Sequence, residues 1–201
     1  FFSAAADKIL LLSCLPGYVE GGRAKGSCAA RIYDRKTRVA SEELPVSLHE
    51  GYAYEGTLDW DRSGKKILFR NAQGSIEEYV LSGKSKKYFV YGKDPKWTAD
   101  GQGFYFRPDE GCGLDKYTFS AGKAETVLTC DGKFFLYDNY LTPSRESVVG
   151  WACLGPGAPR DCAFFGVVMA DLKDPARRLI LKDLDDRGST SAVWDAGAAG
   201  E

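Results

Sequence analysis

The sequence predicts an all-β chain that forms a β-propeller of four-stranded antiparallel blades, about four of them within 201 residues. The first supporting observation is a phrase of tryptophan, tight turn and strand, which is clearest at 60–69 and 97–106. Weaker copies begin at Phe2 and Leu141, and a truncated copy begins at Trp194. The second observation is that short runs of β-branched and aromatic residues alternate with glycine-containing turns. No segment shows the apolar spacing of an amphipathic helix.

Each repeat is expected to contain an inner strand, a tight turn and three further strands. In the clearest copy, Trp60 ends the inner strand, and Gly64 supplies the left-handed backbone conformation that the turn needs. The expected strands are 8–15, 28–34 and 38–44; 58–60, 66–70, 75–81 and 86–91; 94–98, 103–107, 114–120 and 125–130; 134–141, 147–154, 162–172 and 178–184; and 191–194.

The whole chain, 1–201, is interpreted as a single propeller domain or part of one. Its approximate repeats are 1–53, 54–92, 93–131 and 132–189, and 190–201 begins a further repeat or supplies a closing strand. Two explanations stay open. In one, the chain is a fragment of a larger propeller. In the other, the last strand completes the first blade and closes a four-bladed ring, which leaves only protected sheet edges.

The six cysteines favour disulfide bonds, and the strand assignment selects three local pairs. The expected pairs are Cys14 with Cys28, Cys112 with Cys130, and Cys153 with Cys162. Each pair flanks a turn, so its members are expected to face each other across an antiparallel hairpin. Three disulfides predict an oxidising location, either periplasmic or extracellular. Free buried thiols and a zinc site are the alternatives, although the sequence lacks the Cys-x-x-Cys spacing of many zinc sites.

The charge composition argues against a nucleic-acid partner, because 27 basic and 28 acidic residues leave a net charge of −1. No apolar run approaches the roughly 18 residues that a membrane-spanning helix needs, so no membrane span is expected. The sequence contains no phosphate-binding loop and no recognisable metal motif, so neither a cofactor nor a metal is expected.

Catalysis by a Ser-His-Asp or Cys-His mechanism would have to use His49, the single histidine of the sequence. His49 lies in a predicted connection between two blades, where a polar side chain is ordinary. The sequence also lacks the Gly-x-Ser-x-Gly elbow of α/β-hydrolases. We therefore predict a protein that is not an enzyme.

One face of the predicted propeller is the candidate binding face. It carries the loops between the second and third strands of each blade and the connections between blades. The three predicted disulfides brace this face, which would lower the ordering cost of binding. Tyrosine and arginine are frequent interface anchors. The candidate binding residues are Tyr18, Arg23, Lys25, Tyr52, Tyr54, Tyr91, Arg107, Asp109, Glu110 and Arg160. In the alternative interpretation, the disulfides only stabilise a secreted fold.

The phrases Trp-Asp-Arg-Ser-Gly-Lys-Lys-Ile-Leu-Phe at 60–69 and Trp-Thr-Ala-Asp-Gly-Gln-Gly-Phe-Tyr-Phe at 97–106 resemble the TolB-type WD40-like propeller repeat, with an echo at 8–11. That family usually has Trp-Ser-Pro-Asp-Gly at the turn, and both phrases depart from it. The resemblance implies a β-propeller, often six-bladed and often periplasmic, that is used for protein binding. The repeats are also similar to those of the propeller that gates prolyl-oligopeptidase-family enzymes.

The leading hypothesis is a non-enzymatic, secreted or periplasmic propeller that binds a protein or peptide through its disulfide-braced loop face. The first alternative is the gating propeller of a prolyl-oligopeptidase-like hydrolase whose catalytic domain is absent from this chain. The second is a stand-alone propeller enzyme that acts on sugars or lactones. Such an enzyme needs convergent acidic side chains, for which Asp59, Asp94 and Asp138 are the candidates on the inner strands.

Overall fold

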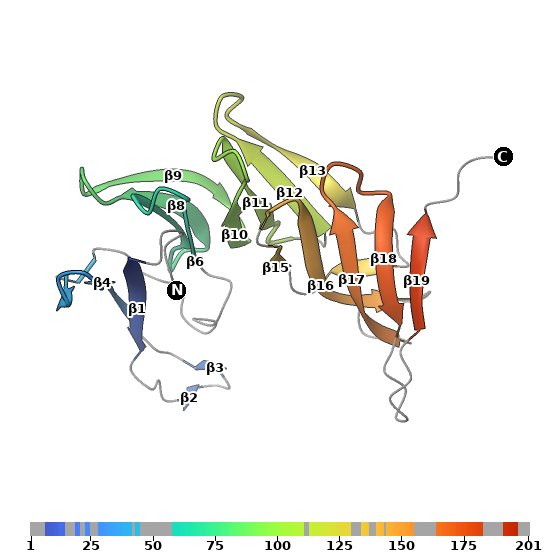
Figure 1. The fold of residues 1–201 in the computed structure, drawn as a ribbon, viewed down its shortest axis with the longest axis horizontal. Coiled ribbons are helices and arrows are strands. Elements are labelled where there is room, and N and C mark those ends of the chain that lie inside the picture. The colour runs from blue at the N-terminus through green and yellow to red at the C-terminus, as the bar shows by residue number, and fades with distance from the viewer. Residues whose placement is uncertain are drawn as a thin grey trace. The chain divides into compact units, whose positions relative to one another are not determined.

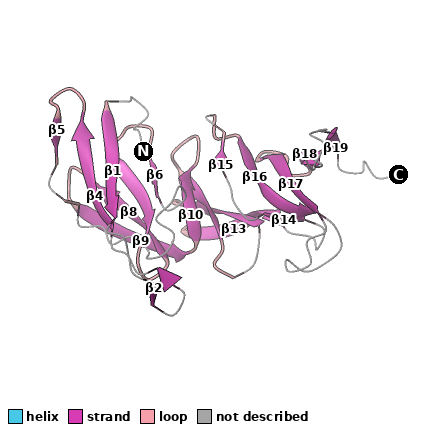
Figure 2. Ribbon diagram, turned by 90° about the horizontal axis from the view of Figure 1, so that it is seen from below, coloured by secondary structure: helices cyan, strands magenta, loops and turns pink. Residues whose placement is uncertain are grey.

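The structure is a computed structural model that describes residues 7–14, 19–20, 23–24, 28–41, 43–44, 58–110, 113–129, 134–136, 140–142, 144–154, 164–182 and 191–196. The described part consists of strands and the turns between them, and it contains no helix (Figures 1 and 2). Within it, no helix long and apolar enough to cross a membrane is found. The antiparallel sheets are the blades of a β-propeller fold.

The chain divides into two compact units, and each is described here by itself. The first unit contains 1–97 and 101–109, and the second contains 98–100 and 110–201. The hairpin of β10 and β11 belongs to the first unit, and the hairpin of β12 and β13 belongs to the second unit.

The first sheet of the first unit has the strand order β1-β4-β5, formed by β1 (Lys8–Cys14), β4 (Cys28–Asp34) and β5 (Val39–Ala40). The pairing of β1 with β4 is antiparallel and continuous from Lys8 opposite Asp34 to Cys14 opposite Cys28. A small hairpin of β2 (Val19–Glu20) and β3 (Arg23–Ala24) lies between these two strands in the sequence.

The next sheet has the order β6-β7-β8-β9 and matches the expected strands of this repeat closely. Its members are β6 (Leu58–Trp60), β7 (Lys66–Arg70), β8 (Ser75–Val80) and β9 (Ser85–Tyr91). Alternation sets the inward side chains, because neighbouring residues of a strand point to opposite faces. The inner strand β6 has Leu58 and Trp60 buried on either side of a partly exposed Asp59.

The hairpin of β10 (Lys93–Trp97) and β11 (Gly103–Arg107) follows within the first unit. Phe104 and Phe106 of β11 are buried, and the Phe104 ring lies 5.4 Å from that of Phe89, measured between ring centroids. Gly92 connects β9 to β10 where there is no room for a side chain. A Cβ atom there would overlap the Phe106 ring and lie 2.9 Å from the carbonyl oxygen of Arg107.

The core of the first unit joins its two sheets. A cluster of buried side chains is contributed by β1 and β4 from one sheet and by β6, β7 and β8 from the other. Its members are Leu10, Ala30, Leu58, Trp60, Ile67, Phe69 and Tyr79. Burial of these large apolar side chains is the main stabilising term for the unit.

The second unit contains the hairpin of β12 (Gly113–Thr118) and β13 (Lys123–Thr129) and a larger sheet. The larger sheet has the order β14-β16-β17-β18-β19, with β15 (Tyr140–Leu141) also paired to β16. The other strands are β14 (Phe134–Leu136), β16 (Ser147–Leu154), β17 (Phe164–Asp171), β18 (Arg177–Lys182) and β19 (Ser191–Ala196).

The last strand corrects one expectation. We predicted that 191–194 would begin a further repeat or close the first blade. Instead, β19 pairs antiparallel with β18 over six positions, from Arg177 opposite Ala196 to Lys182 opposite Ser191. It is therefore an additional strand on the outer edge of the preceding sheet. The backbone groups of β18 that face away from β17 are satisfied by β19, and this pairing takes the place of a separate inner strand.

Candidate functional site

The predicted binding face falls partly on described residues. Tyr91, Arg107, Asp109 and Glu110 are described, and Arg23 is placed on β3 without a described side chain. The other candidates lie outside the described residues; they are Tyr18, Lys25, Tyr52, Tyr54 and Arg160. His49 and Asp138, which the catalytic alternatives would use, also lie outside them. The site is therefore built from the loops of the first unit.

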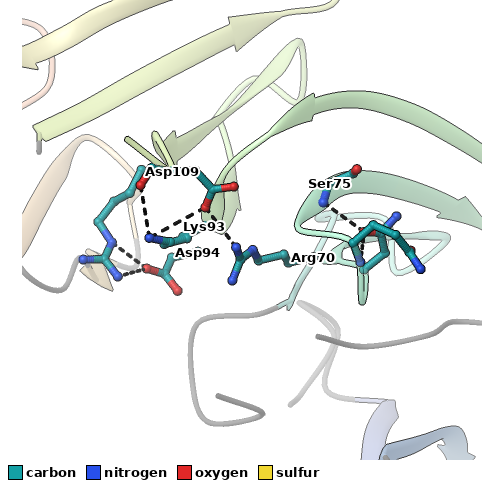
Figure 3. Close-up of polar contacts among 8 residues, drawn as sticks. Arg70, Ser75, Lys93, Asp94 and Asp109 are labelled. Atoms are coloured by element: carbon teal, nitrogen blue, oxygen red, sulfur yellow. Dashed lines mark hydrogen bonds and ion pairs between the residues drawn. The ribbon is translucent and has the colours of Figure 1, made fainter. Parts of the chain in front are cut away.

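Asp109 is the centre of the site. Its carboxylate oxygen Oδ1 accepts a hydrogen bond from Nη2 of Arg70 at 2.9 Å, and the same oxygen lies 3.7 Å from Nζ of Lys93. The Lys93 ammonium also donates to the backbone carbonyl of Asp109 at 3.3 Å. Figure 3 shows Asp109 between the two cations. One carboxylate thus joins the end of β7 to the start of β10 and the end of β11.

A second ion pair lies beside the first. Arg107 donates from Nε to Oδ2 of Asp94 at 2.6 Å, and its Nη2 lies 2.6 Å from the same oxygen. Asp94 has a positive φ of 51°, which is an uncommon conformation for a residue other than glycine. Because both side chains are largely buried, the pair fixes the start of β10 against the end of β11.

The turn between β7 and β8 forms the third part of the site. The Oδ1 atom of Asn71 accepts hydrogen bonds from the backbone N–H groups of Gln73 at 3.0 Å and Ser75 at 2.9 Å. The Nδ2 atom of Asn71 donates to Glu77 at 2.5 Å. Gly74 follows with a φ of 89°, and a Cβ atom there would lie 3.2 Å from Nη2 of Arg70. Glycine therefore leaves the space that the Arg70 guanidinium occupies beside Asp109.

We call six of these residues the polar rim: Arg70, Asn71, Lys93, Asp94, Arg107 and Asp109. They come from the β7–β8 turn and from both ends of the β10–β11 hairpin, all within the first unit. The backbone joins these parts as well, because the N–H of Gly92 donates to the carbonyl of Gly74 at 3.1 Å. Side chains of the polar rim are therefore held in place before any ligand arrives.

The polar rim carries three cations and two carboxylates, so its formal charge is positive. The Lys93 side chain is 38% exposed, whereas that of Arg70 is 11% exposed. Within the described residues, the buried Nε of Arg70 has no hydrogen-bond partner. The ammonium of Lys93 is therefore the most accessible charge of the rim, and its position is fixed by Asp109.

Aromatic surface adjoins the polar rim along the chain. Tyr91, one residue before Gly92, is 58% exposed, and its ring packs edge-on against Tyr88 with 6.0 Å between ring centroids. Tyr91 was predicted as a binding residue and is available as one. Glu110 is also exposed. Arg107 and Asp109 are less exposed than Lys93 and form ion pairs within the chain, so we assign them to organising the rim.

Sequence reasoning missed Arg70, Asn71 and Lys93. Arg70 was assigned only as the last residue of a strand, and Lys93 as part of a connection. A usable signal was present, because each lies within one residue of a loop or connection assigned to the predicted binding face. What could not be read from the sequence is that the Asp109 carboxylate selects Arg70, a residue 39 positions earlier in the chain.

The strand register gives different information for each of the three predicted cysteine pairs. Cys14 and Cys28 are opposite each other at the end of the β1–β4 pairing. Gly113 is opposite Thr129, and these are the sequence neighbours of Cys112 and Cys130, which lie outside the described residues. Cys153 is opposite Phe165 of β17, not Cys162, which is also outside them. The three bonds themselves stay predictions, because no cysteine side chain is described.

The carboxylates proposed for a catalytic channel have structural partners. Asp59 accepts a hydrogen bond from the backbone N–H of Trp97 at 2.9 Å, and Asp94 binds Arg107. In the described part of the chain, no group of three or more His, Cys, Asp or Glu side chains is placed to hold a metal ion.

The structure is similar to known β-propellers. It matches TolB from Acinetobacter baumannii with a TM-score of 0.60 and 18% identity, covering 98% of this chain and 51% of that one. It matches a putative TolB from Agrobacterium tumefaciens with a TM-score of 0.56 and 14% identity, covering 95% and 62%. The β-propeller domain of Cps50 (Swd1) from Myceliophteria thermophila matches with a TM-score of 0.51 and 12% identity, covering 96% and 69%.

These matches show the fold, a TolB-like β-propeller, and the chain spans about half the length of the Acinetobacter TolB. No protein-family model matches the sequence, and no curated protein sequence matches it. At such low identity, a shared fold does not carry a shared activity.

Proposed function

We propose that this chain is a non-catalytic binding propeller of the periplasm or the extracellular space, and that it binds a protein or peptide through the polar rim. The observation that carries the proposal is the Asp109 bridge between Arg70 and Lys93. The bridge fixes three loop segments without a ligand, and pre-organisation of this kind lowers the entropy cost of association.

The chemistry of the rim supports a peptide-like ligand. An accessible ammonium at Lys93 attracts a carboxylate, and the exposed ring of Tyr91 offers apolar contact with a polar tip. Aromatic residues such as tyrosine are enriched at protein interfaces. The carboxylates of Asp94 and Asp109 are neutralised by neighbouring cations, which supports binding over acid–base catalysis.

The proposed location rests on the cysteines. The register places Cys14 opposite Cys28, at the cross-strand position where a disulfide can form. Disulfides persist in oxidising compartments. Peptide mapping of the non-reduced protein tests this part, and a free thiol at Cys14 in protein isolated from its native source would contradict it.

The test of binding starts with peptides selected from a displayed random library on the purified full chain. The dissociation constant of the tightest synthetic peptide is then measured by calorimetry for the wild type, Lys93→Ala and Lys65→Ala. Lys65 is a matched control because it is an exposed lysine of the same unit, in the β6–β7 turn and outside the polar rim. The proposal predicts that Lys93→Ala weakens binding about five- to tenfold, while Lys65→Ala changes it less than about twofold.

Equal effects of the two substitutions, or selected peptides whose affinity is indifferent to Lys93, would contradict the proposal. Thermal unfolding of both variants serves as the control for folding. A variant that melts like the wild type but binds differently reports on the rim itself.

A further inference from the structure

The outer strand β9 has an accessible edge. It ends the order β6-β7-β8-β9, and among the described residues its one strand neighbour is β8. The four residues from Ser85 to Tyr88 are all exposed. An edge strand presents unpaired backbone N–H and C=O groups, which another extended segment can pair.

A bulge shapes this edge. Glu77 of β8 is opposite Tyr88, and the preceding residue, Ile76, is opposite Val90, so Phe89 is one extra residue in β9. The bulge brings Tyr88 and Tyr91 to the same face of the strand, where their rings contact edge-on. Both rings are more than half exposed. The edge therefore carries an aromatic pair beside its backbone groups.

The charge of this segment is positive. Lys84, Lys86 and Lys87 occur within four residues, and no acidic residue follows before Asp94. The acidic residues on β8 are engaged elsewhere, because Glu78 pairs with Lys66 at 3.0 Å and Glu77 accepts from Asn71. The Lys87 ammonium lies instead over the Phe89 ring, 5.2 Å from its centroid. An incoming carboxylate would meet an exposed positive charge here.

The chain itself shows that the outer edge of a blade accepts one more strand. In the second unit, β19 pairs with β18, which is the outermost strand of its repeat as β9 is of its own (Figure 1). The register of that added strand places Asp195 opposite Arg178. At the equivalent edge, strand addition thus places residues of opposite charge at paired backbone positions.

We propose that the β9 edge binds an acidic, extended segment of a partner protein as an added β-strand. The backbone groups of β9 select a peptide in extended conformation, and the exposed ammonium groups of Lys84 and Lys87 select one that carries carboxylates. A second copy of the same edge is disfavoured, because pairing two β9 strands would bring like charges together. Tyr91 borders both this edge and the polar rim, but none of the six rim residues belongs to β9, so the proposal goes beyond peptide binding at the rim and does not depend on it.

The probe is a peptide of about eight residues that alternates glutamate with valine. Its matched control is the same sequence with all internal backbone nitrogens methylated, which keeps every side chain but removes the N–H donors. Calorimetry gives the affinity for the full chain, for Lys87→Glu and for Lys65→Glu. Hydrogen exchange follows the amides of 85–91 with and without each peptide.

The proposal predicts that the unmethylated peptide protects amides of β9, and that the methylated peptide does not. Lys87→Glu should weaken binding about tenfold, and Lys65→Glu, at an exposed lysine of the β6–β7 turn that is not part of β9, by less than about twofold. Equal affinity for both peptides would reduce the interaction to charge attraction and overturn the proposal. A concentration-dependent dimer that Lys87→Glu abolishes would assign the edge to a second copy and also overturn it.

Discussion

The two ends of the β6–β9 sheet are built from different kinds of contact. At one end, the β6–β7 turn satisfies itself, because Oδ1 of Asp61 accepts from the N–H groups of Lys65 and Lys66, both at 2.8 Å. At the other end, the polar rim depends on partners that are distant in sequence, such as Arg70 and Asp109, 39 residues apart. Local contacts can be copied from repeat to repeat, whereas the rim requires particular residues from two sheets.

The self-contained turn recurs along the chain in the same backbone conformation. The φ angle is 66° at Gly64 and 69° at Gly101, the fifth residues of the two clearest phrases. At the same position of the weaker copy, Arg145 has a φ of 62°. The turn geometry is thus kept even where glycine is replaced, which identifies it as part of the scaffold. The polar rim has no such copies among the described residues, and we infer that it carries the function.

The largest loss of stability is expected at Gly92, next to the polar rim, where there is no space for a side chain. Gly92→Ala would place a methyl group against the Phe106 ring and the Arg107 carbonyl, and overpacking of this kind costs about 2–3 kcal/mol. Urea unfolding measures the loss of stability. A cost below that of Gly101→Ala, whose Cβ would meet no neighbouring atom, would mean that the rim is more loosely packed than the structure shows.

Removal of the central charge of the rim should have the next largest effect. Asp109→Asn keeps the size of the side chain but leaves the mostly buried Arg70 without its carboxylate, which costs about 1–2 kcal/mol. Glu125→Gln is the matched control, because the Lys123–Glu125 pair is exposed on both sides. Equal losses of stability in the two variants would show that the Asp109 bridge is an ordinary surface ion pair.

At the turn end, Gly101→Ala tests the backbone alone. Its φ of 69° is strained for alanine, and the added Cβ would have open space around it. We expect a loss of about 1 kcal/mol in the free energy of unfolding. No loss would show that the turn tolerates other residues and does not depend on the left-handed conformation of this position.

The converse substitution, Arg145→Gly, should stabilise the protein slightly. Glycine removes the strain of the positive φ of 62°. The free energy gained in this way exceeds the cost of glycine's larger entropy in the unfolded chain by about 0.5 kcal/mol. The midpoint of thermal unfolding is the measurement. A lower midpoint would show that the Arg145 side chain contributes more to stability than the strain it imposes.

The smallest expected effect concerns a turn in the first sheet. The backbone N–H of Thr37 and, to a smaller extent, that of Lys36 donate to Asp34, and these hydrogen bonds lower the pKa of its carboxyl. Because the pKa is lower in the folded state, the stabilisation is complete above the ordinary pKa of aspartate. It is lost as the pH falls through the lowered value. A titration followed by NMR should give this lowered pKa, and an ordinary pKa would contradict the hydrogen bonds from the turn to Asp34.

Much of the fold was predictable because strands and turns are determined largely by their own short stretches of sequence. The strands at 66–70, 103–107 and 147–154 begin and end as predicted, and Gly64 has the expected positive φ. Strand partners are less local. The truncated phrase at Trp194 predicts a strand over 191–194 but not which edge it joins, and β19 pairs with β18. Likewise, the sequence does not indicate the register of β16 against β17, which places Cys153 opposite Phe165.

The candidate site was predictable only in its position. Tyr91, which was predicted as a binding residue, is exposed beside a connection between sheets, and its role in binding stays a prediction. Arg107 and Asp109 were predicted as anchors because arginine and acidic residues are common at interfaces. Their ion pairs with Asp94 and Arg70 are long-range contacts that depend on the packing of one hairpin against another, and no local pattern specifies them.

The most direct test of the polar rim as the binding surface is hydrogen exchange on the full chain with a peptide selected for binding. We predict that the peptide slows exchange at 71–74, 91–94 and 107–109, and leaves the turns at 61–66 and 81–85 unchanged. Protection confined to those two turns would place binding at the opposite end of the sheet and contradict the proposed function.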